Sequence, residues 1–197
     1  MNQFRLIAMM IAASMLTGAL LLINTGCDEE KDDNASLLLL LSPSGTKRIF
    51  QTASTYTGNL GGVAGADAKC MADANKPSGG VWKALIASSE RSKSSNWVLK
   101  RNTTYIRTGD GAEIARTGLT KVIFSFPIVN TITTVPVTDV WTGLNVDWTN
   151  GTNCNNWSSD SDQDWGECGN SFRTDSGVIH YCGSSCNATY PIYCVEQ

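Results

Sequence analysis

The sequence predicts a small α+β domain that is braced by disulfide bonds. Three observations lead to this class. The 197 residues include 7 Cys. Residues 65–75 repeat apolar side chains with the period of an amphipathic helix. Much of the remaining chain consists of short β-branched and aromatic runs separated by Gly, Asn, Asp and Ser, a pattern that is typical of strands and turns.

Composition excludes several classes of protein. Hydrophobic residues make up 42% of the chain and charged residues 17%, which excludes a disordered tail and a polytopic membrane protein. The formal net charge is −3, whereas a dedicated nucleic-acid-binding protein is expected to be strongly basic. Because the chain holds a single His, a His-rich metal site is excluded. The length suits one domain after removal of a targeting segment.

The N-terminus has the pattern of an export signal. Residues 6–23 are almost wholly apolar and end at Asn24-Thr25-Gly26-Cys27, which acidic residues follow at once. Length alone does not exclude a membrane span of about 20 residues, but the small residues before Cys27 favour a signal. The segment resembles a bacterial lipoprotein signal peptide over residues 1–26, which implies that Cys27 is acylated and anchors the protein in a membrane. An ordinary secretory signal with an incidental Cys is the alternative.

Residues 27–46 are predicted to form the acylated Cys and a flexible tether. The segment contains a cluster of acidic residues and five consecutive leucines, Leu37–Leu41, and its end is marked by Pro43 and Gly45. Five residues are too few to cross a bilayer. A low-complexity linker is the preferred interpretation, and contact of the leucines with lipid is the alternative. The folded domain is predicted to cover residues 47–197.

The domain is expected to begin with a strand and a helix. Residues 48–52 predict the first strand. The glycine-rich segment 58–62 lacks the Lys-Ser/Thr ending and the spacing of phosphate-binding loops, so we interpret it as a turn. A helix is predicted near Gly65–Asn75, because its apolar residues fall on one face with Cys70 toward the core, and Pro77 follows its end.

Further β segments follow the helix, each short and rich in β-branched or aromatic residues. They cover residues 81–87, 97–99, 103–107, 122–126, 140–144, 178–181 and 192–195. Residues 142–176 are predicted to be a long loop region with little regular structure, which Cys154 and Cys168 would staple. With the helix, these segments predict a small, mostly antiparallel sheet and one or two helices.

Six cysteines remain when Cys27 is set aside. In an exported domain they predict three disulfides, and six cysteines allow fifteen pairings. A zinc site is the competing interpretation. However, the sequence has no C-x2-C pair, and Cys182-x3-Cys186 has no matching second pair. The residues alone therefore predict disulfides without their connectivity.

Several motifs, in one order along the chain, resemble known families. Val140-Trp141-Thr142-Gly143-Leu144 is similar to the Trp-x-Gly-Leu strand of C-type-lectin-like domains, and Ile192-Tyr193-Cys194-Val195-Glu196 is similar to their last strand. Residues 65–70 and 81–86 resemble the helix and next strand of endostatin, as do Cys154-x-x-Trp157 and Cys186-x3-Tyr190-x3-Cys194. The arrangement over residues 56–67 resembles the leptospiral endostatin-like lipoproteins.

The resemblance implies a C-type-lectin-like (endostatin-like) domain and the disulfides Cys70–Cys194 and Cys154–Cys186. Cys168 and Cys182 are left and are expected to pair with each other, within the loop that Cys154–Cys186 closes. It also implies binding to extracellular-matrix proteins such as laminin and fibronectin, to a complement regulator or to plasminogen. The expected location is the outer membrane at the cell surface, and a periplasmic orientation is the alternative.

The loop Asp160-Ser161-Asp162-Gln163-Asp164 is the best metal candidate. Carboxylates at alternate positions suit Ca2+, the one cofactor that the sequence leaves open. An EF-hand is excluded, because Trp165 and Ser171 stand where Gly and Glu are required. The Glu-Pro-Asn and Gln-Pro-Asp triplets of sugar-binding C-type lectins do not occur. A solvated acidic loop without metal is the preferred interpretation.

Charge is distributed unevenly along the chain. Residues 69–121 hold ten Lys/Arg and four Asp/Glu, whereas residues 139–197 hold eight Asp/Glu and one Arg. A basic surface would bind sulfated glycans or acidic proteins, and salt would weaken that binding. The alternative is that the two segments lie together and neutralise each other. The ligand-binding candidates are Arg91, Lys93, Lys100 and Arg101, with Trp165 as an exposed aromatic anchor.

These observations lead to three functional hypotheses. The first is a membrane-anchored adhesin that binds host matrix or plasma proteins. The second is a glycan-binding module, which would use Ca2+ at the acidic loop or recognise sulfate through the basic segment. The third is an envelope structural protein without a host ligand. An enzyme is the least favoured class, because the sequence shows no nucleophile–base pair and no nucleotide-binding loop.

Overall fold

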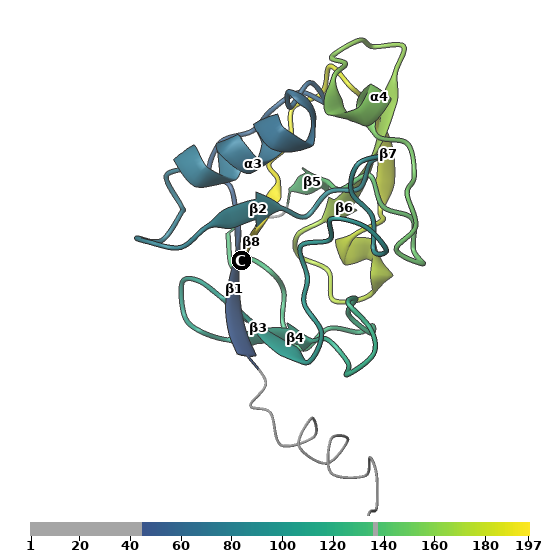
Figure 1. Cartoon of the computed structure of the whole chain (residues 1–197). Helices are drawn as coiled ribbons and strands as arrows, with labels where there is room; N and C mark the ends of the chain where they lie inside the picture. Colours follow the sequence, from purple (N-terminus) through teal and green to yellow (C-terminus); the bar gives the residue numbers. More distant parts are fainter. Residues whose placement is uncertain (1–44, 136–137) are drawn as a thin grey trace, which may run out of the picture. The chain divides into compact units, whose positions relative to one another are not determined.

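The computed structural model describes residues 45–135 and 138–197 (Figure 1). The predicted signal peptide, Cys27 and the predicted tether up to residue 44 lie outside the described residues. The first strand, β1 (Gly45–Gln51), begins two residues before the predicted domain boundary, so the last two residues of the predicted tether belong to a sheet. Within the described residues, no helix is both long and apolar enough to cross a membrane.

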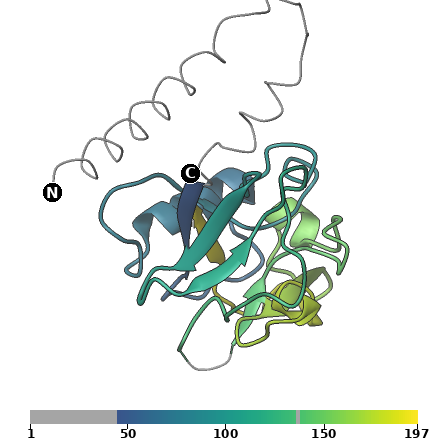
Figure 2. The same cartoon turned by 90° about the horizontal axis from the view of Figure 1, so that it is seen from below.

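The fold is α+β, and its larger sheet has five strands in the order β2-β8-β1-β3-β4. Strands β1 and β3 pair in parallel, whereas the pairs β1–β8, β2–β8 and β3–β4 are antiparallel. Figure 2 views this sheet from the side of β3 and β4. The strands that accompany β1 are β2 (Trp82–Ala84), β3 (Thr103–Arg107), β4 (Glu113–Arg116) and β8 (Tyr193–Glu196).

The smaller sheet has three antiparallel strands in the order β5-β6-β7. These are β5 (Asp139–Trp141), β6 (Trp165–Asn170) and β7 (Cys182–Ser185). Helix α3 (Gly62–Ala72) packs beside β2 (Figure 1). Two short elements complete the fold: the turn α4 (Cys154–Trp157) and the 3-10 helix η1 (Ser176–Val178).

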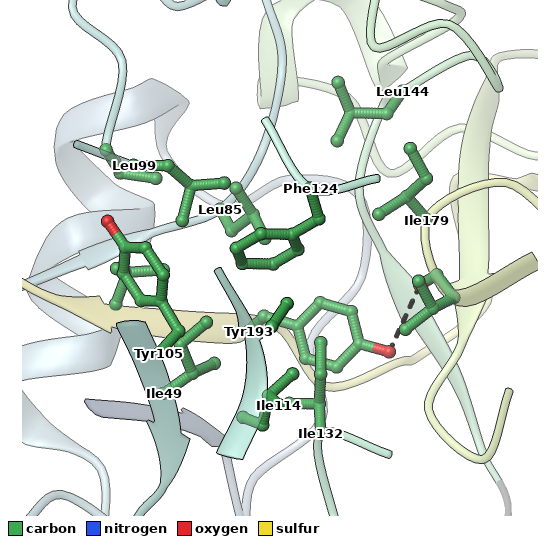
Figure 3. Close-up of a cluster of buried hydrophobic side chains, with 14 of the residues drawn as sticks. Ile49, Leu85, Leu99, Tyr105, Ile114, Phe124, Ile132, Leu144, Ile179 and Tyr193 are labelled. Atoms are coloured by element: carbon green, nitrogen blue, oxygen red, sulfur yellow. Dashed lines mark hydrogen bonds between the residues drawn. The ribbon is translucent and has the colours of Figure 1, made fainter. Parts of the chain in front are cut away.

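Strand β1 separates two hydrophobic cores. Successive side chains of a strand point to opposite faces, so Ile49 and Phe50 are both buried but in different clusters. The cluster around Ile49 includes Tyr105 of β3 and Tyr193 of β8 (Figure 3). The Tyr193 hydroxyl donates to the main-chain oxygen of Val178 over 3.3 Å. Burial raises the pKa of Tyr193 far above its usual range, so this donor keeps its proton at neutral pH.

The second core lies between the larger sheet and α3 and continues to Trp141 and Trp157 beside the smaller sheet. The rings of Phe50 and Trp82 meet edge to face, with centroids 5.0 Å apart. Ala66 and Cys70 are the buried residues of the helix stripe that the sequence predicts, whereas Met71 is exposed. This packing fixes α3 against β2 and β8.

Three disulfides brace the domain, and they are the three expected pairs. Cys70–Cys194 joins α3 to β8, Cys154–Cys186 joins α4 to the segment before β8, and Cys168–Cys182 joins β6 to β7. In the chain-entropy model, each bridge contributes about 3–5 kcal/mol by restricting the unfolded chain.

Helix α3 starts three residues before its predicted position. Gly61 takes a left-handed conformation (φ 81) and turns the chain into the helix at Gly62. The helix ends at Ala72 because Asp73 is extended. The Asp73 carboxylate contacts the segment after β1, where it accepts the main-chain N–H of Ala53 over 2.9 Å.

Several predicted β segments were wrong. Residues 97–99 and 122–126 pack in or against the first core but form no sheet strand, and only residues 82–84 of segment 81–87 form a strand. Of the predicted strand 178–181, Val178 ends η1 and residues 179–181 follow it without forming a strand. The Asp175 carboxylate accepts the N–H of Gly177 over 2.9 Å and stabilises this turn. Conversely, the predicted loop region 142–176 contains β6, the central strand of the smaller sheet.

Substitution of Gly143 by Ala tests the steric role of the Trp-x-Gly-Leu motif. Gly143 has φ 62, and a Cβ atom there would lie 2.7 Å from the Trp157 ring and 2.8 Å from the main-chain oxygen of Ala87. We expect Gly143→Ala to lower the free energy of unfolding by about 2–5 kcal/mol in urea denaturation. The control Gly118→Ala places a methyl group in open space and should change it by no more than about 0.5 kcal/mol. Equal effects of the two substitutions would contradict this account.

Candidate interaction surface

The turn α4 has a left-handed backbone, which is unusual outside glycine. Cys154, Asn155, Asn156 and Trp157 have φ angles of 50, 53, 55 and 64°. This conformation costs L-residues about 1–2 kcal/mol each. Such strain persists only where the surroundings enforce it, and it occurs preferentially at functional sites.

Three interactions hold the strained turn in place. Cys154 is bridged to Cys186. The indole N–H of Trp157 donates to the main-chain oxygen of Ala87 over 2.8 Å, and the Trp157 side chain is fully buried. The side chain of Asn153 accepts the N–H of Asn156 over 3.0 Å. The loop that follows α4 therefore begins at a turn that is held in place.

Trp165 is the most prominent side chain at the other end of this loop. It is 56% exposed, although its backbone pairs with Ser185 at the start of the β6–β7 ladder. A Cβ atom at Gly183 would lie 3.7 Å from the indole ring, so the ring lies beside a residue without a side chain. The arrangement presents a large rigid aromatic surface on a strand that cannot move freely.

Three aspartates precede Trp165 in the same loop. Asp160 and Asp162 are exposed, and Asp164 is half-buried and accepts a hydrogen bond from the Ser159 hydroxyl. The main-chain oxygen of Asp164 accepts the N–H of Cys186 over 2.9 Å, which attaches the loop to the disulfide. We call Asp160, Asp162, Asp164 and Trp165 the tryptophan–acid surface.

Asp160, Asp162 and Asp164 are also the candidate calcium ligands of the sequence. Across residues 45–135 and 138–197, no group of three or more His, Cys, Asp or Glu side chains is placed to hold a metal ion. Asp162 instead accepts the side-chain amide of its neighbour Gln163 over 3.1 Å. The chain turns at Asp162 and Gln163, so the three aspartates do not follow one face of an extended segment.

His180 lies outside any strand. Its Nδ1 is 2.9 Å from the main-chain oxygen of Leu144 and 3.3 Å from the Glu167 carboxylate. The Glu167 carboxylate also accepts the Thr152 hydroxyl over 3.1 Å. His180 therefore connects the smaller sheet to the segment after β5.

The assignment of Arg91 to a ligand-binding surface was wrong. Its side chain is 1% exposed, and the guanidinium donates two hydrogen bonds, of 2.7 and 2.8 Å, to the Asp67 carboxylate on α3. It also donates to the main-chain oxygen of Ala84 over 2.8 Å. Arg91 thus ties the segment after β2 to the helix. Asp67 lies three residues before Cys70 on the side of the helix that meets the core, but no local pattern joins it to Arg91, 24 residues away.

The other basic candidates do lie at the surface. Lys93 is exposed, and its ammonium donates to the main-chain oxygen of Asp147 over 2.8 Å. Lys100 and Arg101 are adjacent and exposed, just before β3. Removal of Arg91 from the group leaves a smaller basic surface than the sequence predicts.

The basic and acidic segments of the chain are not joined by ion pairs. The salt bridges of the described residues are Arg48–Glu196, Arg91–Asp67, Arg107–Asp110, Arg173–Asp175 and His180–Glu167. None links a Lys or Arg of residues 69–121 to an acid of residues 139–197. In the part of the chain that the structure describes, direct pairing therefore does not neutralise the tryptophan–acid surface.

Sequence reasoning missed two further exposed aromatic residues. Phe172 follows β6, and Tyr181 precedes β7. The Arg173 guanidinium lies 5.1 Å from the centroid of the Tyr181 ring and also pairs with Asp175. This cation–π contact places a positively charged group against an exposed aromatic ring in this part of the chain.

Replacement of Arg91 by Met tests whether this residue is structural. Met keeps much of the volume but leaves the Asp67 carboxylate with only the Ala84 main-chain N–H and no charged partner, so we expect a loss of about 3 kcal/mol of unfolding free energy in urea. The double variant Arg91→Met/Asp67→Leu should recover part of that loss. Lys93→Met is the control at an exposed position and should stay within about 0.5 kcal/mol of the wild type. A neutral effect of Arg91→Met would contradict this structural role.

The chain matches the model of a protein family. Residues 53–174, more than half of the chain, match the family described as "Protein of unknown function (DUF1554)". The match includes α3, the acidic loop and Trp165, together with one cysteine of each disulfide. No curated protein matches the chain. The chain therefore belongs to the DUF1554 family.

Proposed function

We propose that this chain is an exported lipoprotein whose domain binds a macromolecular partner through the tryptophan–acid surface. The observation that carries the proposal is the exposure of Trp165 beside three aspartates, on a loop held by a disulfide at each end. Aromatic residues that are exposed and rigid are frequent anchors of protein interfaces. Because both ends of the loop are fixed, binding a partner there would cost less conformational entropy.

Export is supported by the cysteines. All six cysteines of the described domain are paired, and disulfides of this kind form in oxidising compartments. An acylated Cys27 would then hold the domain at a membrane. We propose the outer membrane and the cell surface as its location.

A C-type-lectin-like, endostatin-like fold is the more specific part of the proposal. In its support, α3 is followed by β2, and the last strand carries Cys194 bridged to the helix. The Trp-x-Gly-Leu segment lies at the end of β5 with Trp141 buried. The resemblance to endostatin-like lipoproteins suggests matrix and plasma proteins, such as laminin, fibronectin, a complement regulator or plasminogen, as partners.

The chemistry of the surface favours a basic segment of the partner protein. Asp160 and Asp162 are exposed, and residues 139–172 contain no Lys or Arg that would neutralise them. A Lys or Arg side chain of the partner would meet carboxylates and the indole face together. Such an interface should weaken as the salt concentration rises.

A sulfated glycan is the second candidate ligand. Lys100 and Arg101 support it, because they are adjacent and exposed, and neither forms a salt bridge within the described residues. This binding would use a different surface from Trp165. The two hypotheses are therefore separable by substitution.

Trp165→Ala tests the proposed anchor. We expect it to weaken binding to immobilised laminin or fibronectin at least tenfold in surface plasmon resonance, because truncation of an aromatic anchor removes much of the binding energy. Phe172→Ala is the matched control, since Phe172 is also 56% exposed but lies outside the surface. Asp160→Asn/Asp162→Asn should reduce the dependence of wild-type binding on salt.

The opposite pattern would identify the other surface. If Trp165→Ala binds like the wild type, and Lys100→Ala/Arg101→Ala binds weakly and responds to competing heparin, the basic residues are the site. If all of these variants bind like the wild type, both proposals are wrong.

A further inference from the structure

A cavity of about 630 Å3 opens at the carboxyl ends of β1 and β3. One wall comes from the segment after α3, with Asn75 and Pro77, and the other from residues 132–135. Its size lies within the range of small-molecule pockets, about 300–1,000 Å3. It shares no residue with the tryptophan–acid surface.

Gln51 is the most informative residue of this cavity. It is 8% exposed, and its side-chain oxygen has no hydrogen-bond partner within the described residues. A buried amide oxygen without a partner costs free energy, so such groups are rare unless a ligand or water completes them. Gln51 lines the cavity, and rotation about its soft amide torsion would present either end of the amide to a ligand there.

The charged residues of the wall neutralise each other. The Arg107 guanidinium donates to both carboxylate oxygens of Asp110, over 2.9 and 2.7 Å, and to the main-chain oxygen of Thr131 over 2.8 Å. The hydrogen bond from Arg107 lowers the pKa of Asp110 to about 2, so the pair stays ionised and closed at neutral pH. A charged ligand would have to open this pair.

The remaining lining combines neutral polar groups with apolar surface. Asn75 and Thr133 supply an amide and a hydroxyl, and the Asn75 amide is oriented by donating to the main-chain oxygen of Gln51 over 2.9 Å. Pro77 and Ile132 contribute apolar atoms. A sugar ring has the matching properties, since its hydroxyls donate and accept hydrogen bonds while its C–H faces are apolar.

We propose that this cavity binds a neutral sugar of one or two rings, with the Gln51 amide hydrogen-bonded to a ligand hydroxyl. The site stands apart from the proposed protein-binding surface and does not depend on it. No metal ion is required, because protein amides and hydroxyls supply the contacts.

The test is a titration of the full chain, in a detergent without a sugar headgroup, with glucose, galactose, N-acetylglucosamine, maltose and lactose. Amide chemical shifts of the isotope-labelled protein and calorimetry report binding. We expect saturable shifts at Gln51, Thr133 and their neighbours for at least one neutral sugar. Glucuronate and glucosamine, which carry charge, should bind more weakly.

Gln51→Leu is the decisive variant. It should weaken sugar binding about fivefold or more, because the ligand loses a buried hydrogen bond. It should unfold at the same or a higher urea concentration than the wild type, since a buried polar atom without a partner is removed. Gln163→Leu, at an exposed glutamine outside the cavity, and Trp165→Ala should both leave sugar binding unchanged.

Three outcomes would overturn the proposal: no sugar of the panel binds saturably, Gln51→Leu binds sugar as well as the wild type, or only the charged sugars bind. A loss of protein binding in Trp165→Ala with intact sugar binding would separate this site from the proposed function.

Discussion

The packing of Trp141 between the two sheets is the interaction on which the rest of the structure depends. Trp141 ends β5 and is fully buried. Its main-chain N–H donates to the main-chain oxygen of Pro191 over 3.0 Å, and its indole N–H donates to the main-chain oxygen of Tyr56 over 2.8 Å. Its ring meets Trp157 and Tyr190 edge to face, with centroids 5.9 and 4.8 Å apart. One side chain therefore connects the smaller sheet, α4 and the segments beside the larger sheet.

The disulfides extend this junction toward the surface. Cys154–Cys186 lies so close to Gly58 and Gly166 that a Cβ atom at either position would overlap the Cys154 sulfur. Cys168–Cys182 holds β6 against β7. Because β6 begins at Trp165, the exposed indole belongs to a strand that is fixed from both sides. The strained backbone of α4 is tolerated because the burial of Trp157 and the disulfide at Cys154 prevent other backbone conformations of this turn.

The α+β class and the presence of disulfides were predictable from local patterns, whereas the residues alone left fifteen pairings open and the resemblance to endostatin implied the connectivity. The last strand carries Cys194, and Glu196 after it accepts hydrogen bonds of 2.9 and 2.6 Å from Arg48, so this motif has a structural role. Those bonds hold the pKa of Glu196 below its usual value. Strand β6 was missed because Gly166 and Gly169 are poor strand formers, yet neighbouring atoms leave no room for side chains there.

The errors at the candidate sites have a common cause. A charged residue does not reveal its burial without its partner, and the partner of Arg91 is 24 residues away on α3. The cavity beside Gln51 draws on segments from residue 50 to residue 135, so no local pattern indicates it. Trp165 was identifiable because a large aromatic residue among aspartates has few neighbours to bury it.

We propose that this domain faces outward and binds a partner there. The most direct measurement labels intact cells with a membrane-impermeant amine reagent, with a periplasmic protein as the control. Lys93, Lys100 and Lys121 are exposed, so the folded domain should react. We predict the same extent of labelling before and after lysis, while the control reacts only after lysis. Labelling of the domain only after lysis would contradict the account and place it inside the envelope.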